Sequence, residues 1–248
     1  MEILKGWEPF SFDNGSKTGI LLIHGFTGST SSVVYLGRRL SEAGFNVEGP
    51  RLSGHGTRWE DLNNVSCKDW LRDVESSYSN LRKNSKIIFA AGLSMGGMLS
   101  LRMAELHPEI RGVITINHFL FVDSPLAPFT PVIKLFLKSV PGQTGDIKDP
   151  AEKEISYGRT PVAGVHEVRK LQKIVRKDIG RIVVPALMFK SKNDHVVKIR
   201  STVWAYENIS SKDKELVWLE NSYHVATQDF DKDIIAEKSI EFIKKHSF

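Results

Sequence analysis

The sequence predicts an α/β protein with a mostly parallel, doubly wound sheet, helices on both faces, and a helical insertion between two strands. Short apolar runs alternate with segments of helical periodicity, which is typical of strands and crossover helices around a parallel sheet. The 248 residues are within reach of one such domain. One stretch of about 65 residues interrupts the alternation and is too long to be a structureless loop.

Composition excludes several classes of protein. The apolar content of 41% and charged content of 25% are ordinary for a globular chain and exclude disorder. The net charge of +5 is far from the dense basic stripe of a nucleic-acid binder. A single cysteine, Cys67, excludes an internal disulfide framework and a cysteine-based zinc site.

The N-terminal residues and the hydropathy pattern bear on localisation. Residues 1–14 are mixed and aromatic, unlike a secretory signal. No uncharged apolar stretch reaches the ~18 residues of a membrane span. We therefore expect a soluble, cytoplasmic protein that is at most peripheral to a membrane, with its oligomeric state left open.

Five strands and three core helices are expected in chain order. The first four strands are continuous apolar runs, as in strands buried on both faces, and the fifth is weaker. The expected strands are residues 19–24, 86–91, 113–116, 186–189 and 214–219. The expected helices are Ser66 to Leu81, with a Ser66–Asp69 capping box, Met95 to His107 before Pro108, and the C-terminal stripe Ala236 to Ile243.

The insertion is expected over residues 118–182, between core segments 1–117 and 183–248. Two amphipathic helices are predicted in it, Phe129 to Val140 and Val165 to Asp178, the second with a basic outer surface. Such segments commonly pack on the core, and a charge run is commonly a solvated helix face. If the first helix exposes apolar side chains, it suits a reversible contact with a membrane or micelle.

The segment Gly92 to Gly97 carries the strongest chemical signal. It contains Gly-x-Ser-x-Gly around Ser94, between a predicted strand and a predicted helix, which is the context of a nucleophile elbow. Small residues two positions before and after the serine leave room for a sharp, strained turn. The alternative, a glycine-rich turn with an incidental serine, is disfavoured by the flanking strand and helix.

A serine nucleophile needs a base, and the base needs an orienting carboxylate. In this architecture the acid and then the histidine follow the nucleophile, each after a strand. Asp194 and His224 fit that order. Asp194 could otherwise be a turn aspartate. The other histidines considered are interpreted as structural: His55, His107, His118, His195 and His246.

Acyl transfer also requires donors for the oxyanion, usually backbone N–H groups. The N–H of Met95, directly after the nucleophile, is one candidate. The N–H of Phe26, in the turn that Gly25 permits after an early strand, is the other. This chemistry needs no metal and no organic cofactor.

With these residues in place, the chain resembles the α/β-hydrolase superfamily, and within it the bacterial monoacylglycerol lipases and related thermostable carboxylesterases. The resemblance covers nearly the whole chain. The stretches that carry it are Leu22 to Gly28, Pro50 to Thr57, Gly92 to Gly97, Gly145 to Tyr157, Thr160-Pro161, Asp194 to Val197 and Asn221 to Asp229.

The resemblance implies an α/β-hydrolase fold in which the insertion forms a lid, or cap, over the serine. In the family the lid offers an apolar face to the acyl chain and to the membrane. A lid glutamate contacts a glycerol hydroxyl, and Glu154 holds the matching position. Without the resemblance, Glu154 would be read as a solvent-facing helix carboxylate. The chain departs from the family near Gln143, where the bacterial members carry an apolar residue that lines the glycerol end of the pocket; Gln143 is expected to bind substrate there.

The sequence thus predicts a serine ester hydrolase that cleaves monoacylglycerols to fatty acid and glycerol through an acyl-enzyme. A general carboxylesterase for short- to medium-chain esters is the main alternative. An aminopeptidase of the same fold would share every catalytic residue. A binding protein that keeps the triad but turns over poorly is the non-enzyme alternative.

Overall fold

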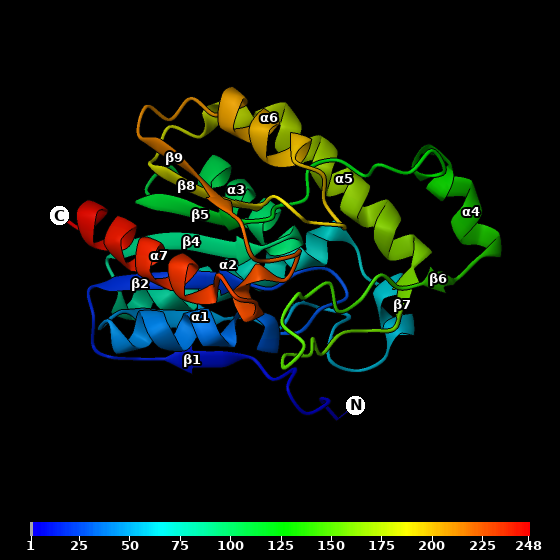
Figure 1. Cartoon of the computed structure of the whole chain (residues 1–248), viewed down its shortest axis with the longest axis horizontal. Coiled ribbons are helices and arrows are strands. Elements are labelled where there is room, and N and C mark those ends of the chain that lie inside the picture. The colour runs from blue at the N-terminus through cyan, green and yellow to red at the C-terminus, as the bar shows by residue number, and fades with distance from the viewer. Residues whose placement is uncertain (1) are drawn as a thin grey trace.

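The computed structural model describes residues 2–248 and has a seven-stranded sheet at its centre (Figure 1). The strand order is β1-β3-β2-β4-β5-β8-β9, and every neighbouring pair is parallel except β1 with β3. The strands are β1 (Phe10–Phe12), β2 (Thr18–Ile23), β3 (Asn46–Gly49), β4 (Ile87–Leu93), β5 (Gly112–Ile116), β8 (Ala186–Ser191) and β9 (Lys214–Leu219).

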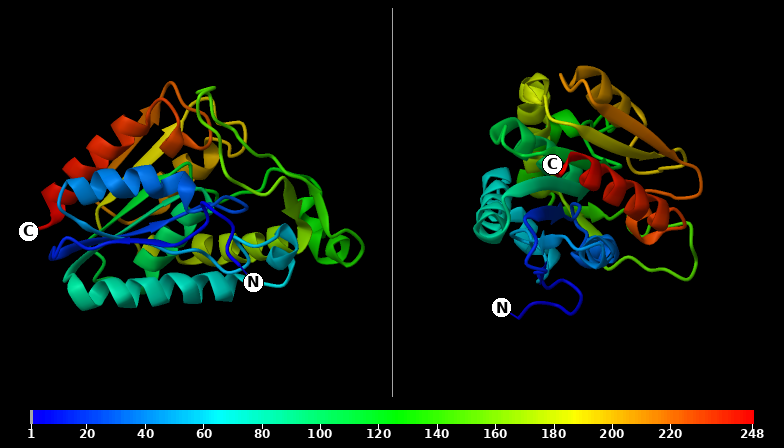
Figure 2. Two further views of the ribbon diagram at one scale, coloured as in Figure 1. Left: turned by 90° about the horizontal axis from the view of Figure 1, so that it is seen from below. Right: turned by 90° about the vertical axis from the view of Figure 1, so that its left-hand side faces the viewer.

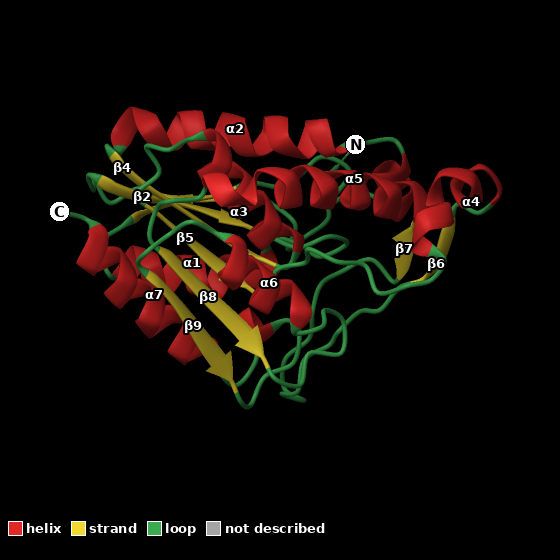
Figure 3. Cartoon of the chain, turned by 90° about the horizontal axis from the view of Figure 1, so that it is seen from above, coloured by secondary structure: helices red, strands yellow, loops and turns green. Residues whose placement is uncertain are grey.

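Helices cover both faces of this sheet, and Figure 3 shows α2, α3 and α6 on the side opposite α1 and α7. The right-hand view of Figure 2 likewise places α2 and α7 on opposite sides. The core helices are α1 (Ser31–Glu42), α2 (Cys67–Asn84), α3 (Met95–Leu106), α6 (Arg200–Asn208) and α7 (Lys232–His246). Short 3₁₀ segments are Trp59–Asn63, Ala127–Phe129, Ile179–Arg181 and Ala226–Gln228.

The continuous apolar runs of the strands follow from this two-sided burial. In β2, Leu21 and Ile23 belong to the cluster under α2 and α3, while Ile20 and Leu22 belong to the cluster under α1 and α7. A strand covered on both faces needs apolar residues at every position, because successive side chains point to opposite faces. The prediction of a doubly wound, mostly parallel sheet is confirmed.

All five predicted strands are present, but strands β1 and β3 of the central sheet and helices α1 and α6 were not predicted. Strand β3 is only four residues long, and Asn46 and Glu48 break its apolar pattern. Its Asn46 carboxamide accepts hydrogen bonds from the N–H groups of Asn14 and Ser16, at 2.7 and 3.1 Å. Helix α1 does carry a helical stripe, Val33, Leu36 and Leu40, so its signal was present and overlooked.

The insertion between β5 and β8 is only partly helical, which corrects the sequence prediction. It comprises α4 (Thr130–Phe136), a two-stranded antiparallel ladder of β6 (Ser139–Pro141) and β7 (Arg159–Pro161), and α5 (Val162–Asp178). The helix predicted from Phe129 to Val140 therefore ends early. Leu137 adopts an extended conformation (φ −120°, ψ 117°), and Val140 pairs with Thr160. Helix α5 begins three residues before the predicted Val165.

The two halves of the insertion differ in how they meet the core. Helix α5 buries Val168, Leu171 and Val175 in the cluster under α2 and α3. Helix α4 lies at the far end of the insertion, beyond the strand ends (Figures 1 and 2). Nearly all of its side chains are at least partly exposed. Within residues 2–248, we find no helix both long and apolar enough to span a bilayer.

Candidate active site

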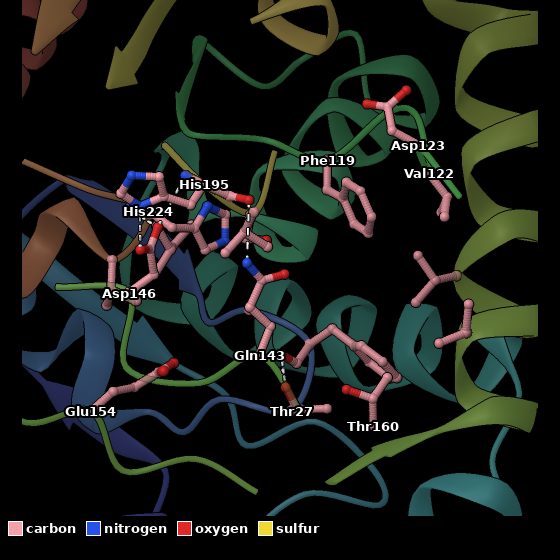
Figure 4. Close-up of a pocket in the computed structure, with 18 of the residues that line it drawn as sticks. Thr27, Phe119, Val122, Asp123, Gln143, Asp146, Glu154, Thr160, His195 and His224 are labelled. Atoms are coloured by element: carbon pink, nitrogen blue, oxygen red, sulfur yellow. Dashed lines mark hydrogen bonds and ion pairs between the residues drawn. The ribbon is translucent and has the colours of Figure 1, made fainter. Parts of the chain in front are cut away.

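A cavity of about 400 Å³ opens where the carboxyl ends of the central strands meet the insertion. Ser94 and His224 line it, as do residues of helix α5 and of the insertion's loops. Its apolar wall is formed by Phe26, Phe119, Val122, Val165, Val168 and Val196. In the view of Figure 4, Phe119 and Val122 lie toward one side with Asp123 beside them, and Glu154, Asp146 and His224 lie toward the other. The cavity therefore has one side rich in apolar side chains, bordered by Asp123, and one side rich in polar groups.

Ser94 stands on the sharp turn between β4 and α3 that the sequence predicts. Its backbone has φ 56° and ψ −115°, a conformation that residues other than glycine rarely adopt. The Ser94 N–H donates to the Ile116 carbonyl at 2.8 Å, which ties the turn to β5. A Cβ on Gly96 would lie 2.0 Å from the Ile23 carbonyl oxygen. Glycine is therefore required for the turn to pack against β2.

The loop after β2 runs directly beside the serine. A Cβ on Gly25 would lie 3.3 Å from Ser94 Cβ, so the backbone approaches the nucleophile closely. The next residues bend sharply, with Thr27 at φ 60°. Within residues 2–248, neither the Phe26 N–H nor the Met95 N–H has a hydrogen-bond partner. Both of the donors predicted for the oxyanion are therefore uncommitted.

Asp194 and His224 meet as predicted. His224 Nδ1 lies 3.1 and 3.0 Å from the two Asp194 carboxylate oxygens. The Val196 and Val197 N–H groups donate to Asp194 Oδ1 at 2.9 and 2.8 Å. Burial favours the protonated acid, but the charges and hydrogen bonds of His224 and Lys190 outweigh it and hold the pKa of Asp194 well below its usual range. Asp194 is an anion at neutral pH.

The Asp194 contact determines which nitrogen of His224 is free. Because an ionised carboxylate only accepts hydrogen bonds, Nδ1 carries a proton, and in the neutral imidazole Nε2 is the unprotonated nitrogen. His224 and Ser94 share the cavity, but no hydrogen bond joins the Ser94 hydroxyl to His224. Such contacts are often long without substrate and tighten when it binds.

Asn117 connects the strand ends that carry the acid and the base. It follows β5 directly and has φ 45°. Its side-chain amide donates to the His224 carbonyl at 2.8 Å and to Ser191 Oγ at 2.9 Å, and its oxygen accepts the Ser191 N–H at 2.8 Å. Sequence reasoning missed this residue. The end of a buried strand was its only signal.

Sequence reasoning also missed Lys190. It occupies β8 with a fully buried side chain, and its ammonium donates to Asp194 Oδ2. The same group donates to the Val197 carbonyl at 2.7 Å and lies 3.4 Å from Asn117 Oδ1. Burial lowers the pKa of Lys190, and the adjacent Asp194 carboxylate opposes that shift.

Asp146 attaches the insertion to the loops that carry the acid and the base. Its carboxylate accepts the His224 N–H at 3.0 Å and the His195 N–H at 3.2 Å, and it lies 2.7 Å from the His195 ring (Figure 4). Gln143 donates to the His195 carbonyl at 3.2 Å. His195, read as structural from sequence, thus lines the cavity and helps join it to the insertion.

Glu154 lies in an extended loop and lines the cavity, so the alternative of a helix carboxylate is wrong. Its Oε2 accepts the Gly145 N–H at 2.8 Å and the Ser156 hydroxyl at 3.2 Å. Its Oε1 has no hydrogen-bond partner in the part of the chain that the structure describes, residues 2–248. One carboxylate oxygen is therefore fixed and the other is open to a ligand.

The remaining candidates have structural surroundings. His118 is buried against Thr115 Oγ1 and the Ser201 carbonyl, and burial lowers its pKa to about 4. His107 contacts Glu75 and Glu109 at the end of α3. Burial raises the pKa of the Cys67 thiol, which disfavours a reactive thiolate.

Comparison with known proteins identifies the family. The profile of the family described as serine aminopeptidase, S33 (Hydrolase_4) matches residues 15–231. The chain belongs to this α/β-hydrolase family. It is 42% identical to a thermostable monoacylglycerol lipase of Bacillus sp. (strain H-257), over 99% of this chain and 97% of that one. It is 30% identical to a carboxylesterase of Bacillus subtilis (strain 168), over 96% of each.

Solved structures agree with the fold. A structure described under LipS and LipT, two metagenome-derived lipolytic enzymes, superposes with a TM-score of 0.96 at 38% identity, covering 99% of this chain and 100% of that chain. A monoglyceride lipase from Saccharomyces cerevisiae shares the fold at a TM-score of 0.81 and 18% identity, covering 96% and 91%. The family and these relatives identify the α/β-hydrolase as a carboxylic ester hydrolase.

The contacts of Asp146 predict that it supports catalysis from outside the reacting atoms. Asp146→Asn replaces one acceptor with a donor facing the N–H groups of His195 and His224. We expect kcat/KM for a small ester to fall about tenfold, since small misplacements of catalytic groups are costly. Asp149→Asn, on the same loop, is the control and is expected to stay within about twofold. Equal rates for both variants would contradict this role.

Proposed function

We propose that this α/β-hydrolase cleaves monoacylglycerols to fatty acid and glycerol through Ser94, His224 and Asp194. The observation that carries the proposal is Ser94 on a strained turn, facing the same cavity as a histidine oriented by a buried carboxylate. The relatives named above, a monoacylglycerol lipase and a carboxylesterase, support the reaction class.

Acylation begins with attack of Ser94 Oγ on the ester carbonyl carbon. His224 Nε2 takes the hydroxyl proton as the C–O bond forms, and the carbonyl oxygen becomes an oxyanion. The Phe26 and Met95 N–H groups would donate to that oxyanion, in a cavity where such hydrogen bonds are strong. The imidazolium then gives its proton to the glycerol oxygen as the ester bond breaks, which leaves an acylated serine.

Deacylation repeats these steps with water as the nucleophile. His224 accepts a proton from water as its oxygen attacks the acyl carbon, and returns that proton to Ser94 Oγ when the fatty acid leaves. Asp194 stays ionised throughout, because its neighbours hold its pKa low. It therefore stabilises the imidazolium without accepting the proton.

The two ends of the cavity fit an amphipathic ester. The wall of phenylalanine and valine side chains suits an acyl chain, and the end with Glu154, Gln143 and Asp146 suits an alcohol with free hydroxyl groups. Because Glu154 Oε2 is held by Gly145 and Ser156, Oε1 is positioned to accept a hydrogen bond from glycerol. A general carboxylesterase would not need this oriented acceptor, and the relative at 30% identity keeps that alternative open.

The insertion, as a lid, would deliver the substrate. Helix α4 exposes Leu135 by 67% and Phe136 by 85%, with Phe129 and Val132 beside them. Lys134 stands on the same helix and Lys138 follows it. Apolar side chains flanked by lysines suit a reversible contact with an anionic membrane or micelle. In such a contact, monoacylglycerol could pass from the lipid surface to the cavity.

The nucleophile is tested by Ser94→Ala. Removing the hydroxyl should lower kcat for a monoacylglycerol by at least about 10⁴-fold and abolish labelling by a fluorophosphonate. Ser124→Ala, which changes another serine of the same cavity, is the control and should be labelled normally. Labelling that persists in Ser94→Ala would reject the assignment of the nucleophile.

The substrate class is tested by Glu154→Gln, with the same acyl chain on glycerol and on methanol. Loss of a charged acceptor should lower kcat/KM for the glycerol ester about tenfold and leave the methyl ester nearly unchanged. Glu152→Gln is the control, because Glu152 pairs with Lys232 outside the cavity. An unchanged ratio would favour the general carboxylesterase.

The lid contact is tested by the double change Leu135→Ser and Phe136→Ser. Loss of both apolar side chains should reduce sedimentation of the protein with anionic phospholipid vesicles at least fivefold, because buried apolar area drives such contacts. Hydrolysis of a short, water-soluble ester should be unchanged. Phe230→Ser, at another exposed phenylalanine, is the control. Equal sedimentation of the unchanged protein and the double variant would count against the lid contact.

A further inference from the structure

A lysine buried behind the acid of the triad is unusual, because transferring an ammonium out of water is costly unless acceptors surround it. The Lys190 side chain is 0% exposed. Three acceptors surround its nitrogen, from Asp194, Val197 and Asn117. A replacement of similar length and no charge, such as methionine, would fill the same space without this cost. The charge itself therefore calls for an explanation.

The position of the Lys190 charge beside Asp194 explains why it is retained. Asp194 Oδ2 accepts hydrogen bonds from the Lys190 ammonium and from His224 Nδ1, the latter at 3.0 Å. Oδ1 accepts hydrogen bonds from two backbone N–H groups. The carboxylate is thus shared between the Lys190 ammonium and an imidazole that, in the proposed mechanism, becomes a cation during catalysis. In a buried setting these charges interact strongly, because solvent screens them poorly.

We propose that Lys190 is a positioning residue that fixes the Asp194 carboxylate and lowers the proton affinity of His224, so that activity extends to lower pH. The inference rests on the proposed triad. Lys190 touches no reacting atom. It acts because its positive charge opposes formation of the imidazolium, while its hydrogen bond to Oδ2 holds Asp194 in the orientation that His224 requires.

Several other ionisable groups face this cluster, and a pH profile must be read against them. Asp146 lies on the insertion and accepts the His224 N–H, and it also acts on the Lys190 charge. His118 lies at the end of β5, near enough for the Lys190 charge to lower its pKa. The further ionisable groups that line the cavity are Asp123, Glu154, His195 and Lys198. All of these groups are still present in a variant in which only Lys190 is replaced.

The test is the pH dependence of kcat/KM for a water-soluble ester in the full chain, with Lys190→Met against the unchanged protein. Removing the cation makes the His224 imidazolium easier to form. The acidic limb of the pH profile of kcat/KM should therefore move to higher pH by about 1 unit. Lys192→Met is the matched control, because Lys192 is half exposed and pairs with Glu220 at 2.6 Å. The acidic limb of the Lys192→Met profile should move by less than about 0.2 pH units.

Two further variants keep the test decisive if the methionine protein does not fold. Lys190→Gln retains a donor but no charge and must shift the limb in the same direction. Lys190→Arg retains the charge and should keep the original limb. A lower kcat with an unmoved limb in Lys190→Met or Lys190→Gln would overturn the inference and leave a structural role alone. Failure of the triad itself would appear separately, as an active Ser94→Ala.

Discussion

The close approach between the β4–α3 turn and the end of β2 is the constraint on which the site depends. A Cβ on Gly96 would lie 2.0 Å from the Ile23 carbonyl oxygen, and one on Gly92 would lie 2.3 Å from the Gly96 carbonyl carbon. Only glycine permits this packing. This packing accompanies the positive φ of Ser94 and brings the Gly25 backbone beside it, so one contact positions both the proposed nucleophile and the loop of the proposed oxyanion donor Phe26.

A chain of charged and polar groups extends from β8 into the insertion. Lys190 meets Asp194, Asp194 meets His224, and Asp146 accepts N–H groups from His224 and His195. Each buried charge has a partner of opposite sign or hydrogen-bond donors, which offsets the cost of removing it from water. The loop of the insertion that carries Asp146 is part of this array, so the position of that loop and the orientation of His224 are coupled.

The parts of the fold that are predictable from sequence are those with a local signal. Strands covered on both faces, the elbow around Ser94, and the order Ser94, Asp194, His224 all have one. Strand β3 has none, because it exists through pairing with β2 and through the side chain of Asn46. The insertion was mispredicted where Val140 pairs with Thr160 across about 20 residues, a tertiary contact that overrides helical periodicity. The interactions of Lys190 and Asp146 are also tertiary contacts, so no local pattern predicts them.

A crystal structure of the protein after reaction with an alkyl fluorophosphonate tests the central claim most directly. The account predicts phosphorus bonded to Ser94 Oγ, with the phosphoryl oxygen about 2.7–3.1 Å from the nitrogens of Phe26 and Met95. The alkyl chain should lie against Phe119 and Val122, with His224 still bonded to Asp194. Phosphorus on another side chain, or a phosphoryl oxygen directed away from both N–H groups, would contradict it.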